Sequence, residues 1–393
     1  MVDGELADDE KLIIEHIRGF YEKLFKESED WRPTWEDVNL KKLSDEDKVW
    51  LQRPFSLEEV ENVIKSFRGD KAPGPDEPAL ALGTSSQKYA PLDWSDYFDQ
   101  EDDIQIPDSD DVFHVYMAGT EGPVIFCLHG GGYSGLSFAL AASKLKEKAR
   151  IVAMDLRGHG KSSTQNDVDL SIETLCGDVI SVLKTMYGDA PPAIVLVGHS
   201  MGGAVAIHVA AKKSLPSLAG LVVVDVVEGT AMASLIHMQK ILSNRMQHFS
   251  TPEKAIEWSV KSGSLRNIDS ARVSIPNTLK YDDSKKCYTH RARLEETEQY
   301  WRGWYEGLSE KFLSSPVPKI LLLAGTDRLD RTLTIGQMQG KFQMVVVRHT
   351  GHAIQEDVPD EFVTLILNFI SHNRIGPHGI EIPGLRRPPQ SKP

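Results

Sequence analysis

Short apolar segments alternate with helix-like segments from Val112 onward, and this alternation constrains the fold more strongly than any other feature of the chain. Continuous apolar runs are typical of parallel strands that helices cover on both faces. Between two of these runs, segment 171–186 repeats apolar residues every three or four positions, as an amphipathic helix does. The sequence therefore predicts an α/β fold with a mostly parallel, doubly wound sheet. The apolar runs lie at 124–128, 151–155, 193–197, 221–224, 320–323 and 344–347.

The alternation lapses between residues 228 and 316, where a stretch of about 85 residues has helical character and many aromatic side chains. An insertion between two strands of an open α/β sheet lies near the carboxyl ends of the strands, where such sheets bind their ligands. We therefore predict a helical cap over about residues 229–316, placed above a binding site.

The formal net charge of −13 is distributed unevenly along the 393 residues. Residues 1–76 carry a net charge of −8 and residues 77–111 a net charge of −9, so the remainder carries +4. Turn-forming and acidic residues in 77–111 leave little to bury, which predicts an acidic linker. We expect a helical extension over 1–76, this linker, an α/β domain over 112–374 and a flexible, proline-rich tail over 375–393.

Composition narrows the class of protein further. At 40% hydrophobic residues the chain has enough material for a large core, which excludes global disorder. No run of about 18 apolar residues is present, so we expect no membrane span. The acidic N-terminus lacks the apolar segment of a secretory signal, and the three cysteines cannot all pair. We therefore expect reduced thiols and a cytoplasmic or nuclear location.

Two segments of the N-terminal extension form a recognisable pattern: residues 55–60 read FSLEEV and residues 69–76 read GDKAPGPD. This pattern resembles the entry to the reverse transcriptase of plant non-LTR retrotransposons. It ends where a glycine would follow Asp76, and no polymerase palm or metal-binding Asp-Asp motif follows. We predict a fused fragment without polymerase activity, with helices over 9–28 and 56–67. An unrelated helical extension is the alternative.

The motif GHSMGG at residues 198–203 is the strongest candidate for catalysis. A Gly-x-Ser-x-Gly pattern is weak alone, but this one follows an apolar strand directly and opens a helix of small residues, as a nucleophile elbow does. The glycines allow a sharp turn, and the helix N-terminus favours the negative charge that develops during attack. We predict Ser200 as the nucleophile. The alternative is that Ser200 only caps the helix.

A second glycine-rich motif, His129-Gly130-Gly131-Gly132, follows the first strong apolar strand. Glycines let a backbone N–H approach a reacting oxygen, and in hydrolases with this elbow the corresponding loop supplies one donor of the oxyanion hole. We predict the Gly131 amide as this donor, with Gly130 or Gly132 as alternatives, and the Met201 amide as the second donor. The spacing does not match that of phosphate-binding glycine loops.

A histidine must act as the general base, and thirteen are present. His352 lies late in the chain, in a loop after the last predicted strand, which fits the order serine, acid, histidine. His349 is the alternative. We expect structural roles for His129 and His159, and we expect His199 to point into the sheet.

Two aspartates at the ends of predicted strands are candidates for the acid that holds the histidine. The commoner hydrolase arrangement takes the acid after the penultimate strand, which favours Asp327. Asp225 lies in a very apolar strand, where a buried carboxylate would need a partner such as a catalytic histidine. Chain position thus favours Asp327 and burial favours Asp225, so these arguments leave both aspartates as candidates.

Four segments of the chain carry a more specific signal. They read GHSMGG at 198–203, DVVEGTAM at 225–232, AIEWSVKSG at 255–263 and GQMQGKFQ at 336–343. Together they resemble the protein phosphatase methylesterases, a family of α/β-hydrolases, whereas general esterases share only the elbow. The resemblance covers about residues 89–374. It implies an α/β-hydrolase fold with Ser200, Asp225 and His352 as the catalytic triad, and Asp327 stays the alternative acid.

The resemblance also implies a function. A member of this family would be a serine carboxylesterase that removes the methyl ester from the C-terminal leucine of the catalytic subunit of protein phosphatase 2A. It would use no metal or organic cofactor, and we expect no nucleic-acid or membrane partner. A general small-ester or lipid hydrolase is one alternative, and a non-catalytic phosphatase-binding protein is the other.

Overall fold

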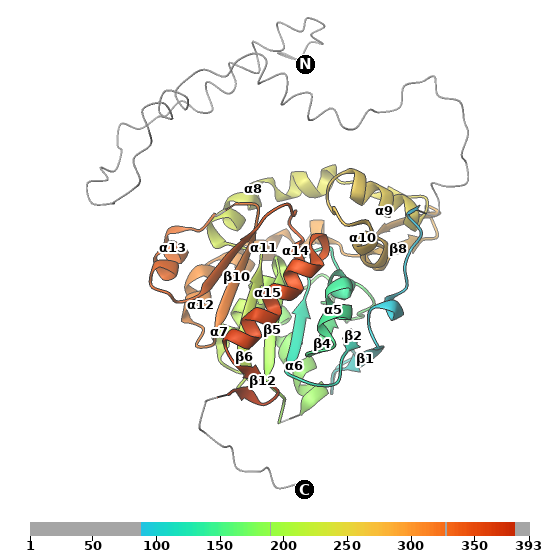
Figure 1. Ribbon diagram of the computed structural model, residues 1–393. Helices are drawn as coiled ribbons and strands as arrows, with labels where there is room; N and C mark the ends of the chain where they lie inside the picture. The colour runs from blue at the N-terminus through green and yellow to red at the C-terminus, as the bar shows by residue number, and fades with distance from the viewer. Residues whose placement is uncertain (1–87, 189, 327, 382–393) are drawn as a thin grey trace, which may run out of the picture. The chain divides into compact units, whose positions relative to one another are not determined.

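An eight-stranded sheet lies at the centre of the structure, a computed structural model that describes residues 88–188, 190–326 and 328–381 (Figure 1). Its strands are β1 (Gln100–Gln105), β2 (Val112–Ala118), β3 (Val124–Leu128), β4 (Arg150–Met154), β5 (Ile194–His199), β6 (Leu218–Val224), β10 (Lys319–Ala324) and β11 (Gln343–Val347). They follow the order β1-β2-β4-β3-β5-β6-β10-β11. β2 pairs antiparallel with β1 and with β4, and every other neighbouring pair is parallel. The predicted mostly parallel sheet is confirmed.

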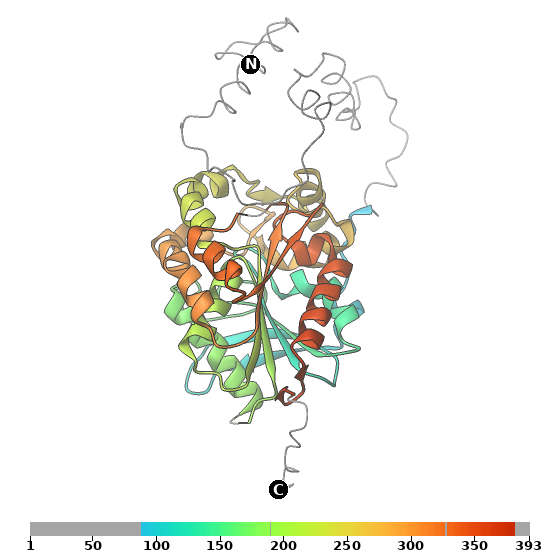
Figure 2. The same ribbon diagram turned by 60° about the vertical axis from the view of Figure 1, so that its left-hand side comes forward.

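Helices cover both faces of the sheet, as the doubly wound arrangement requires (Figures 1 and 2). Side chains of β5 alternate between the faces, because Ile194 and Leu196 belong to one apolar cluster and Val195 and Val197 to the other. One face carries α5 (Ala139–Leu145), α14 (Ile354–Asp357) and α15 (Pro359–His372). The other face carries α6 (Ile172–Tyr187) and α7 (Met201–Lys212). A further helix, α13 (Arg331–Met338), follows β10 in the chain.

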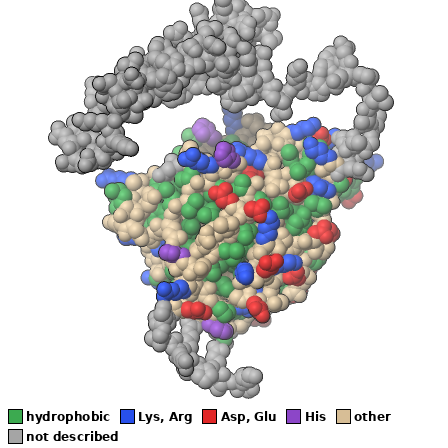
Figure 3. Space-filling view, viewed as in Figure 1, with side chains coloured by type: hydrophobic (Ala, Val, Ile, Leu, Met, Phe, Trp, Pro, Cys, Tyr) green, Lys and Arg blue, Asp and Glu red, His purple; other side chains and the backbone are tan. Residues whose placement is uncertain are grey.

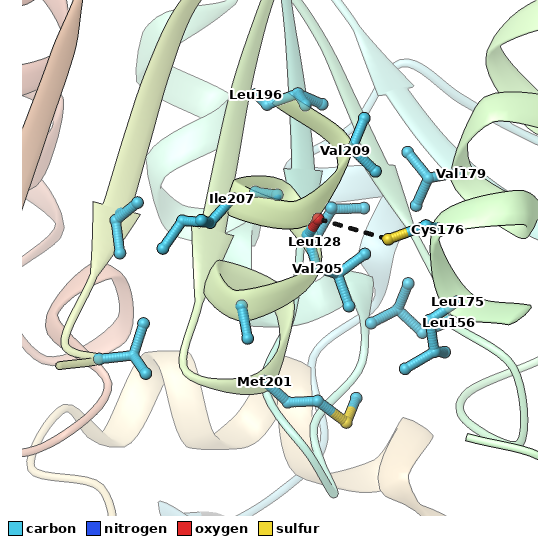
Figure 4. Close-up of a cluster of buried hydrophobic side chains, with 14 of the residues drawn as sticks. Leu128, Leu156, Leu175, Cys176, Val179, Leu196, Met201, Val205, Ile207 and Val209 are labelled. Carbon is cyan, nitrogen blue, oxygen red and sulfur yellow. Dashed lines mark hydrogen bonds between the residues drawn. The ribbon is translucent and has the colours of Figure 1, made fainter. Parts of the chain in front are cut away.

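Helix α7 packs closely between the sheet and α6 because its residues are small and almost all buried. Figure 4 shows the aliphatic side chains around it, with the Cys176 thiol 3.9 Å from the Val205 carbonyl oxygen. Cys176, Cys127 and Cys287 are all free. Dense packing of this kind holds the N-terminus of α7 in one place, and with it the residue that precedes the helix.

The insertion between β6 and β10 lies mostly above the carboxyl ends of the strands, where Figure 1 shows α8, α9 and α10. Its elements are α8 (Glu228–Asn244), β7 (His248–Phe249), α9 (Pro252–Lys261), α10 (Ile268–Ser274), β8 (Leu279–Asp282), β9 (Cys287–His290), α11 (Glu298–Tyr305) and α12 (Leu308–Ser314). The predicted cap included α12, the last helix of the insertion. In the structure, α12 packs against α7 through Leu308 and Phe312. The end of the insertion therefore belongs to the layer of helices that covers the sheet.

The predicted linker over 77–111 is wrong in its described part, because β1 lies within it and pairs along its whole length with β2. Only Ile104 of this edge strand is buried, so its sequence shows little apolar pattern. Its acidic side chains are held in the fold, since Asp103 and Glu101 lie 2.7 and 3.0 Å from the two ring nitrogens of His114.

The tail predicted from residue 375 begins with ordered structure. β12 (Ile375–Gly376) and β13 (Gly379–Ile380) form a short antiparallel hairpin, and the Ile375 side chain is buried. Residues 382–393 lie outside the described residues, as does the segment 1–87 with its predicted helices and its retrotransposon-like motifs. In the part of the chain that the structure describes, no helix is long and apolar enough to cross a membrane.

Candidate active site

Ser200 lies in a sharp turn between β5 and α7. Its backbone has φ 51° and ψ −116°, a conformation that is strained for a residue with a side chain. A Cβ on Gly198 would lie 2.2 Å from the Gly202 carbonyl oxygen, and a Cβ on Gly202 would lie 2.3 Å from the Leu128 carbonyl oxygen. Both positions therefore require glycine. The turn places Ser200 at the N-terminus of α7, where a nucleophile elbow presents its serine.

A pocket of about 410 Å³ opens above Ser200 and combines the edge of the sheet with the cap. The predicted site residues Gly131, Ser200, Met201, Asp225 and His352 all line it, although they are far apart in the sequence. The remaining wall is largely apolar and comes from α8, α11 and the residues before α11. Its apolar members include Met238, Ile241, Leu242, Leu294, Trp301, Trp304 and Tyr305.

Asp225 contacts His352 directly, with 2.6 Å between Asp225 Oδ2 and His352 Nδ1. Asp225 follows β6 with φ 54°, so it is a second strained residue at this site. Its side chain is 2% exposed, whereas the side chain of His352 is 47% exposed. A carboxylate at Nδ1 leaves His352 Nε2 available to take a proton. Asp327, the alternative acid, lies outside the described residues.

The other carboxylate oxygen of Asp225 has two further partners. The Ala324 amide donates to Asp225 Oδ1 over 2.7 Å, and the Arg328 guanidinium forms an ion pair with the same oxygen. These partners offset the cost of burying the charge. Sequence reasoning missed Arg328, which also lines the pocket. The sequence signal that could have indicated Arg328 was its position just after β10, next to the candidate acid Asp327.

The glycine loop after β3 presents one amide to the pocket. The Gly132 amide donates to His159 Nε2 over 2.9 Å, so it is already committed. Gly130 does not line the pocket, whereas Gly131 does, and no acceptor among the described residues takes the Gly131 amide. Met201 is the first residue of α7, where N–H groups have no acceptor within the helix. The geometry therefore favours the amides of Gly131 and Met201 as oxyanion donors.

His129 and His159 are buried beside this loop and hold its backbone. His129 Nδ1 lies 2.8 Å from the Gly130 carbonyl oxygen, and His159 Nδ1 lies 2.8 Å from the Arg157 carbonyl oxygen. Burial lowers the pKa of His129 to about 4 and the pKa of His159 to about 3. Both rings are therefore neutral near pH 7 and have the structural position that the sequence suggested.

His199 does not point into the sheet, and that expectation is wrong. Its Nε2 lies 3.0 Å from the His352 carbonyl oxygen, and the two rings are 4.7 Å apart between centroids. Burial, and then the neighbouring His352, hold the pKa of His199 well below its usual value. The neutral His199 ring therefore supports the loop that carries His352.

Tyr305 of α11 brings the cap to the nucleophile. Burial raises the pKa of Tyr305 to about 12, and the neighbouring Ser200 hydroxyl opposes that rise. No hydrogen bond joins Ser200 to His352 in the described structure. Such contacts are often long in substrate-free enzymes and tighten only when substrate binds. Sequence reasoning placed Tyr305 in the cap without assigning it a contact with Ser200.

A buried carboxyl group links the His352 loop to the cap. Glu356 in α14 is fully buried, and its Oε2 accepts hydrogen bonds from the hydroxyls of Ser270 and Ser274 of α10, over 2.8 and 2.7 Å. Burial raises the pKa of Glu356 to about 8, against the two serine hydrogen bonds and with the help of the Asp357 charge. Glu356 is therefore mostly protonated at neutral pH. No sequence pattern indicated this role.

We expect Glu356→Gln to make the stability of the protein less dependent on pH. The pKa of Glu356 is raised in the folded state, so its contribution is fully present below its unfolded pKa and is lost as pH rises toward 8. Glutamine has no proton to lose. In the wild type, loss of this proton should lower the free energy of unfolding between pH 5 and pH 8. In the variant, the decrease over the same pH range should be smaller by at least about 1 kcal/mol.

Thermal unfolding measured at pH 5, 6, 7 and 8 checks this expectation. Glu361→Gln is the matched control, because Glu361 is exposed on α15 and should leave the pH dependence unchanged. Equal pH dependence in wild type and Glu356→Gln would contradict a protonated Glu356.

Comparison with known proteins agrees with the fold. A model of the Alpha/beta hydrolase family matches residues 125–365. The solved structure of E-2-(acetamidomethylene)succinate hydrolase aligns with a TM-score of 0.60 at 20% identity, covering 69% of this chain and 99% of that chain. A thioesterase domain from the curacin biosynthetic pathway aligns with a TM-score of 0.54 at 22% identity, over 68% of this chain and 99% of that chain. The chain belongs to the α/β-hydrolase family.

Relatives in sequence narrow the family. Protein phosphatase methylesterase 1 of Homo sapiens is 46% identical over 331 residues, which cover 73% of this chain and 86% of that protein. The Schizosaccharomyces pombe protein of the same name is 40% identical over 295 residues, covering 72% of this chain and 85% of that protein. Within the α/β-hydrolases, the chain is a member of the protein phosphatase methylesterases, which are esterases of the serine hydrolase type.

Proposed function

We propose that the chain removes the methyl ester from the C-terminal leucine of the catalytic subunit of protein phosphatase 2A. One observation carries the proposal: in a member of the methylesterase family, the Ser200 elbow and the Asp225–His352 pair open into the same pocket. We assign Ser200 as the nucleophile, His352 as the general base and Asp225 as the acid that orients it.

The reaction then proceeds in two halves. Ser200 Oγ attacks the ester carbonyl carbon while His352 Nε2 takes the hydroxyl proton, and the Gly131 and Met201 amides stabilise the oxyanion. The bond to the methoxy oxygen breaks, and that oxygen takes the proton from His352 and leaves as methanol. Water then attacks the acyl-enzyme with His352 as base, which restores Ser200 and releases a leucine carboxylate.

Asp225 stabilises the imidazolium in both halves, because its buried carboxylate stays on His352 Nδ1. Every proton transfer uses a group of this chain, so the proposal includes no metal or organic cofactor. We also propose a cytoplasmic or nuclear location, which the three free cysteines support.

The pocket supports leucine as the acyl residue. Leu242, Leu294 and Trp301 are buried in its wall and offer an apolar surface to a branched side chain. Burying a leucine side chain contributes about 1.5–3 kcal/mol relative to leaving it exposed. A neutral methyl ester enters such a pocket at less cost than the charged carboxylate that forms from it, which favours product release.

A panel of esters tests the proposal. Peptides that end in leucine methyl ester should be hydrolysed at least about 100-fold more efficiently, in kcat/KM, than the same peptides ending in aspartate α-methyl ester, because the pocket wall is apolar. Methanol release gives the rates. Preferred hydrolysis of long-chain lipid esters would identify a lipid hydrolase instead. Binding of the peptides without methanol release would identify a non-catalytic binding protein.

A further inference from the structure

A second, polar pocket of about 210 Å³ lies between the hydrolase body and the β8–β9 hairpin of the cap. We call it the basic pocket. Three cations and one acid line it, together with Gly158 and Ser162: the cations are Lys280, Arg291 and Arg293, and the acid is Asp167. Over the face of the molecule in Figure 3, by contrast, acidic and basic side chains are interspersed.

Lys280 and Arg291, two of these cations, have no acidic partner among the described residues. Arg291 Nε is also buried without a hydrogen-bond acceptor. The third cation, Arg293, pairs with Glu296 over 3.1 Å. A buried guanidinium nitrogen without an acceptor is costly, and an anion in the basic pocket would remove that cost.

The acid in the basic pocket offsets little of this charge. Asp167 Oδ1 already accepts from the Thr164 amide over 3.1 Å and from the Thr164 hydroxyl over 2.7 Å. Besides Arg293, which pairs with Glu296, its single charge faces the two cations Lys280 and Arg291. The basic pocket therefore keeps a positive excess, which favours a ligand group that carries negative charge.

Adjacent residues of the chain connect the basic pocket with the catalytic pocket and with the glycine loop. Arg293 lines the basic pocket, and the next residue, Leu294, lines the catalytic pocket. Gly158 lines the basic pocket, and the next residue, His159, accepts the Gly132 amide of the glycine loop. An extended peptide advances about 3.3 Å per residue, so each further residue before the leucine extends the reach of a substrate tail by about that length.

We propose that the basic pocket binds an anionic group of the substrate protein, a carboxylate or a phosphoryl group, carried a few residues before the methylated leucine. This proposal rests on the proposed function and adds a specificity site to it. The site selects among methylated C-termini by the charge next to the ester. It contributes to binding and leaves the chemical step unchanged, because none of its lining residues lines the catalytic pocket.

Peptides ending in leucine methyl ester test this proposal. In separate peptides, each position from two to six residues before the leucine carries glutamate, phosphoserine or glutamine. With the wild type, the best anionic peptide should have a KM at least about fivefold below that of its glutamine counterpart, and 0.5 M NaCl should reduce the difference. A preference for glutamate and phosphoserine alike indicates a carboxylate or phosphoryl site. A preference for phosphoserine alone indicates a phosphoryl site.

The double variant Lys280→Gln/Arg291→Gln should lose this preference while its kcat on the glutamine peptide stays unchanged. Lys280→Glu alone, at a more exposed position, should turn the preference against the anionic peptides even if Arg291 proves necessary for folding. Lys285→Gln is the matched control, because Lys285 belongs to the same hairpin and pairs with Asp282 outside the basic pocket.

Equal KM values for anionic and neutral peptides at every position, or an undiminished preference in both Lys280 variants, would overturn the basic pocket as a binding site. That result is distinct from failure of the proposed function. If the wild type releases no methanol even from the neutral peptides, the esterase activity itself is refuted.

Discussion

Ser200→Ala is expected to lower the kcat for methyl-ester hydrolysis by about 10⁴- to 10⁶-fold, which is the range found when a catalytic serine is removed. Alanine cannot form the acyl-enzyme, so only the oxyanion donors and substrate binding remain to accelerate attack by water. The strained turn and the glycines at 198 and 202 stay unchanged. Alanine keeps the Cβ and with it the strain, so the free energy of unfolding should change by less than about 1 kcal/mol.

Ser234→Ala provides the matched control for Ser200→Ala. Ser234 lines the same pocket, but its hydroxyl donates to the Ala231 carbonyl of its own helix over 2.7 Å. An electrophilic probe of active-site serines should label the wild type and Ser234→Ala, and should not label Ser200→Ala. Turnover that survives in Ser200→Ala would show that another group attacks the ester.

Asp225→Asn is expected to lower kcat by about 10³- to 10⁴-fold, whereas Asp327→Asn should lower it less than about tenfold. An amide at position 225 cannot stabilise the imidazolium, and its NH₂ group favours the wrong tautomer of His352. It would also leave the Arg328 charge without its carboxylate partner. Rates measured between pH 6 and pH 9 separate this effect from a shift in the pH optimum.

Asp327→Asn serves as the comparison because chain position alone favours that residue. A larger loss with Asp327→Asn than with Asp225→Asn would move the role of the acid to Asp327. Both variants should be checked for folding, because Asp225 also holds the Ala324 amide over 2.7 Å.

The elbow and the glycine loop could be predicted from the sequence because each is a local unit. An apolar strand, glycines at 198 and 202 and a helix of small residues are contiguous around Ser200, and they determine the turn without help from distant residues. The same holds for Gly131, which lies in a run of glycines just after His129 and the end of β3. Backbone preferences over a few residues are what a single sequence carries most directly.

The partners of these units could not be predicted in the same way. The contact between Asp225 and His352 joins residues 127 positions apart, and the ion pair between Arg328 and Asp225 joins residues 103 positions apart. Strand order decides such contacts, and periodicity does not encode it. For this reason chain position favoured Asp327, whereas the apolar surroundings of Asp225 and the family resemblance indicated Asp225. The acid stays a prediction until the two variants are compared.

The errors in the fold have a related cause. The edge strand β1 buries only Ile104, so its acidic sequence resembles that of a linker. Its place is set by pairing with β2 and by the contacts of Glu101 and Asp103 with His114, which lies on that neighbouring strand. An edge strand with one solvated face and few apolar residues has no sequence pattern that separates it from a charged loop.

The most direct test is the mass of the C-terminal peptide of the methylated catalytic subunit of protein phosphatase 2A after incubation with this protein. Conversion of the methyl ester to the free acid removes one CH₂, about 14 Da, and releases one methanol per leucine. We predict this loss with the wild type and with Ser234→Ala, and an unchanged methylated mass with Ser200→Ala. An unchanged mass with the wild type, or equal loss with wild type and Ser200→Ala, would contradict a Ser200-dependent methylesterase.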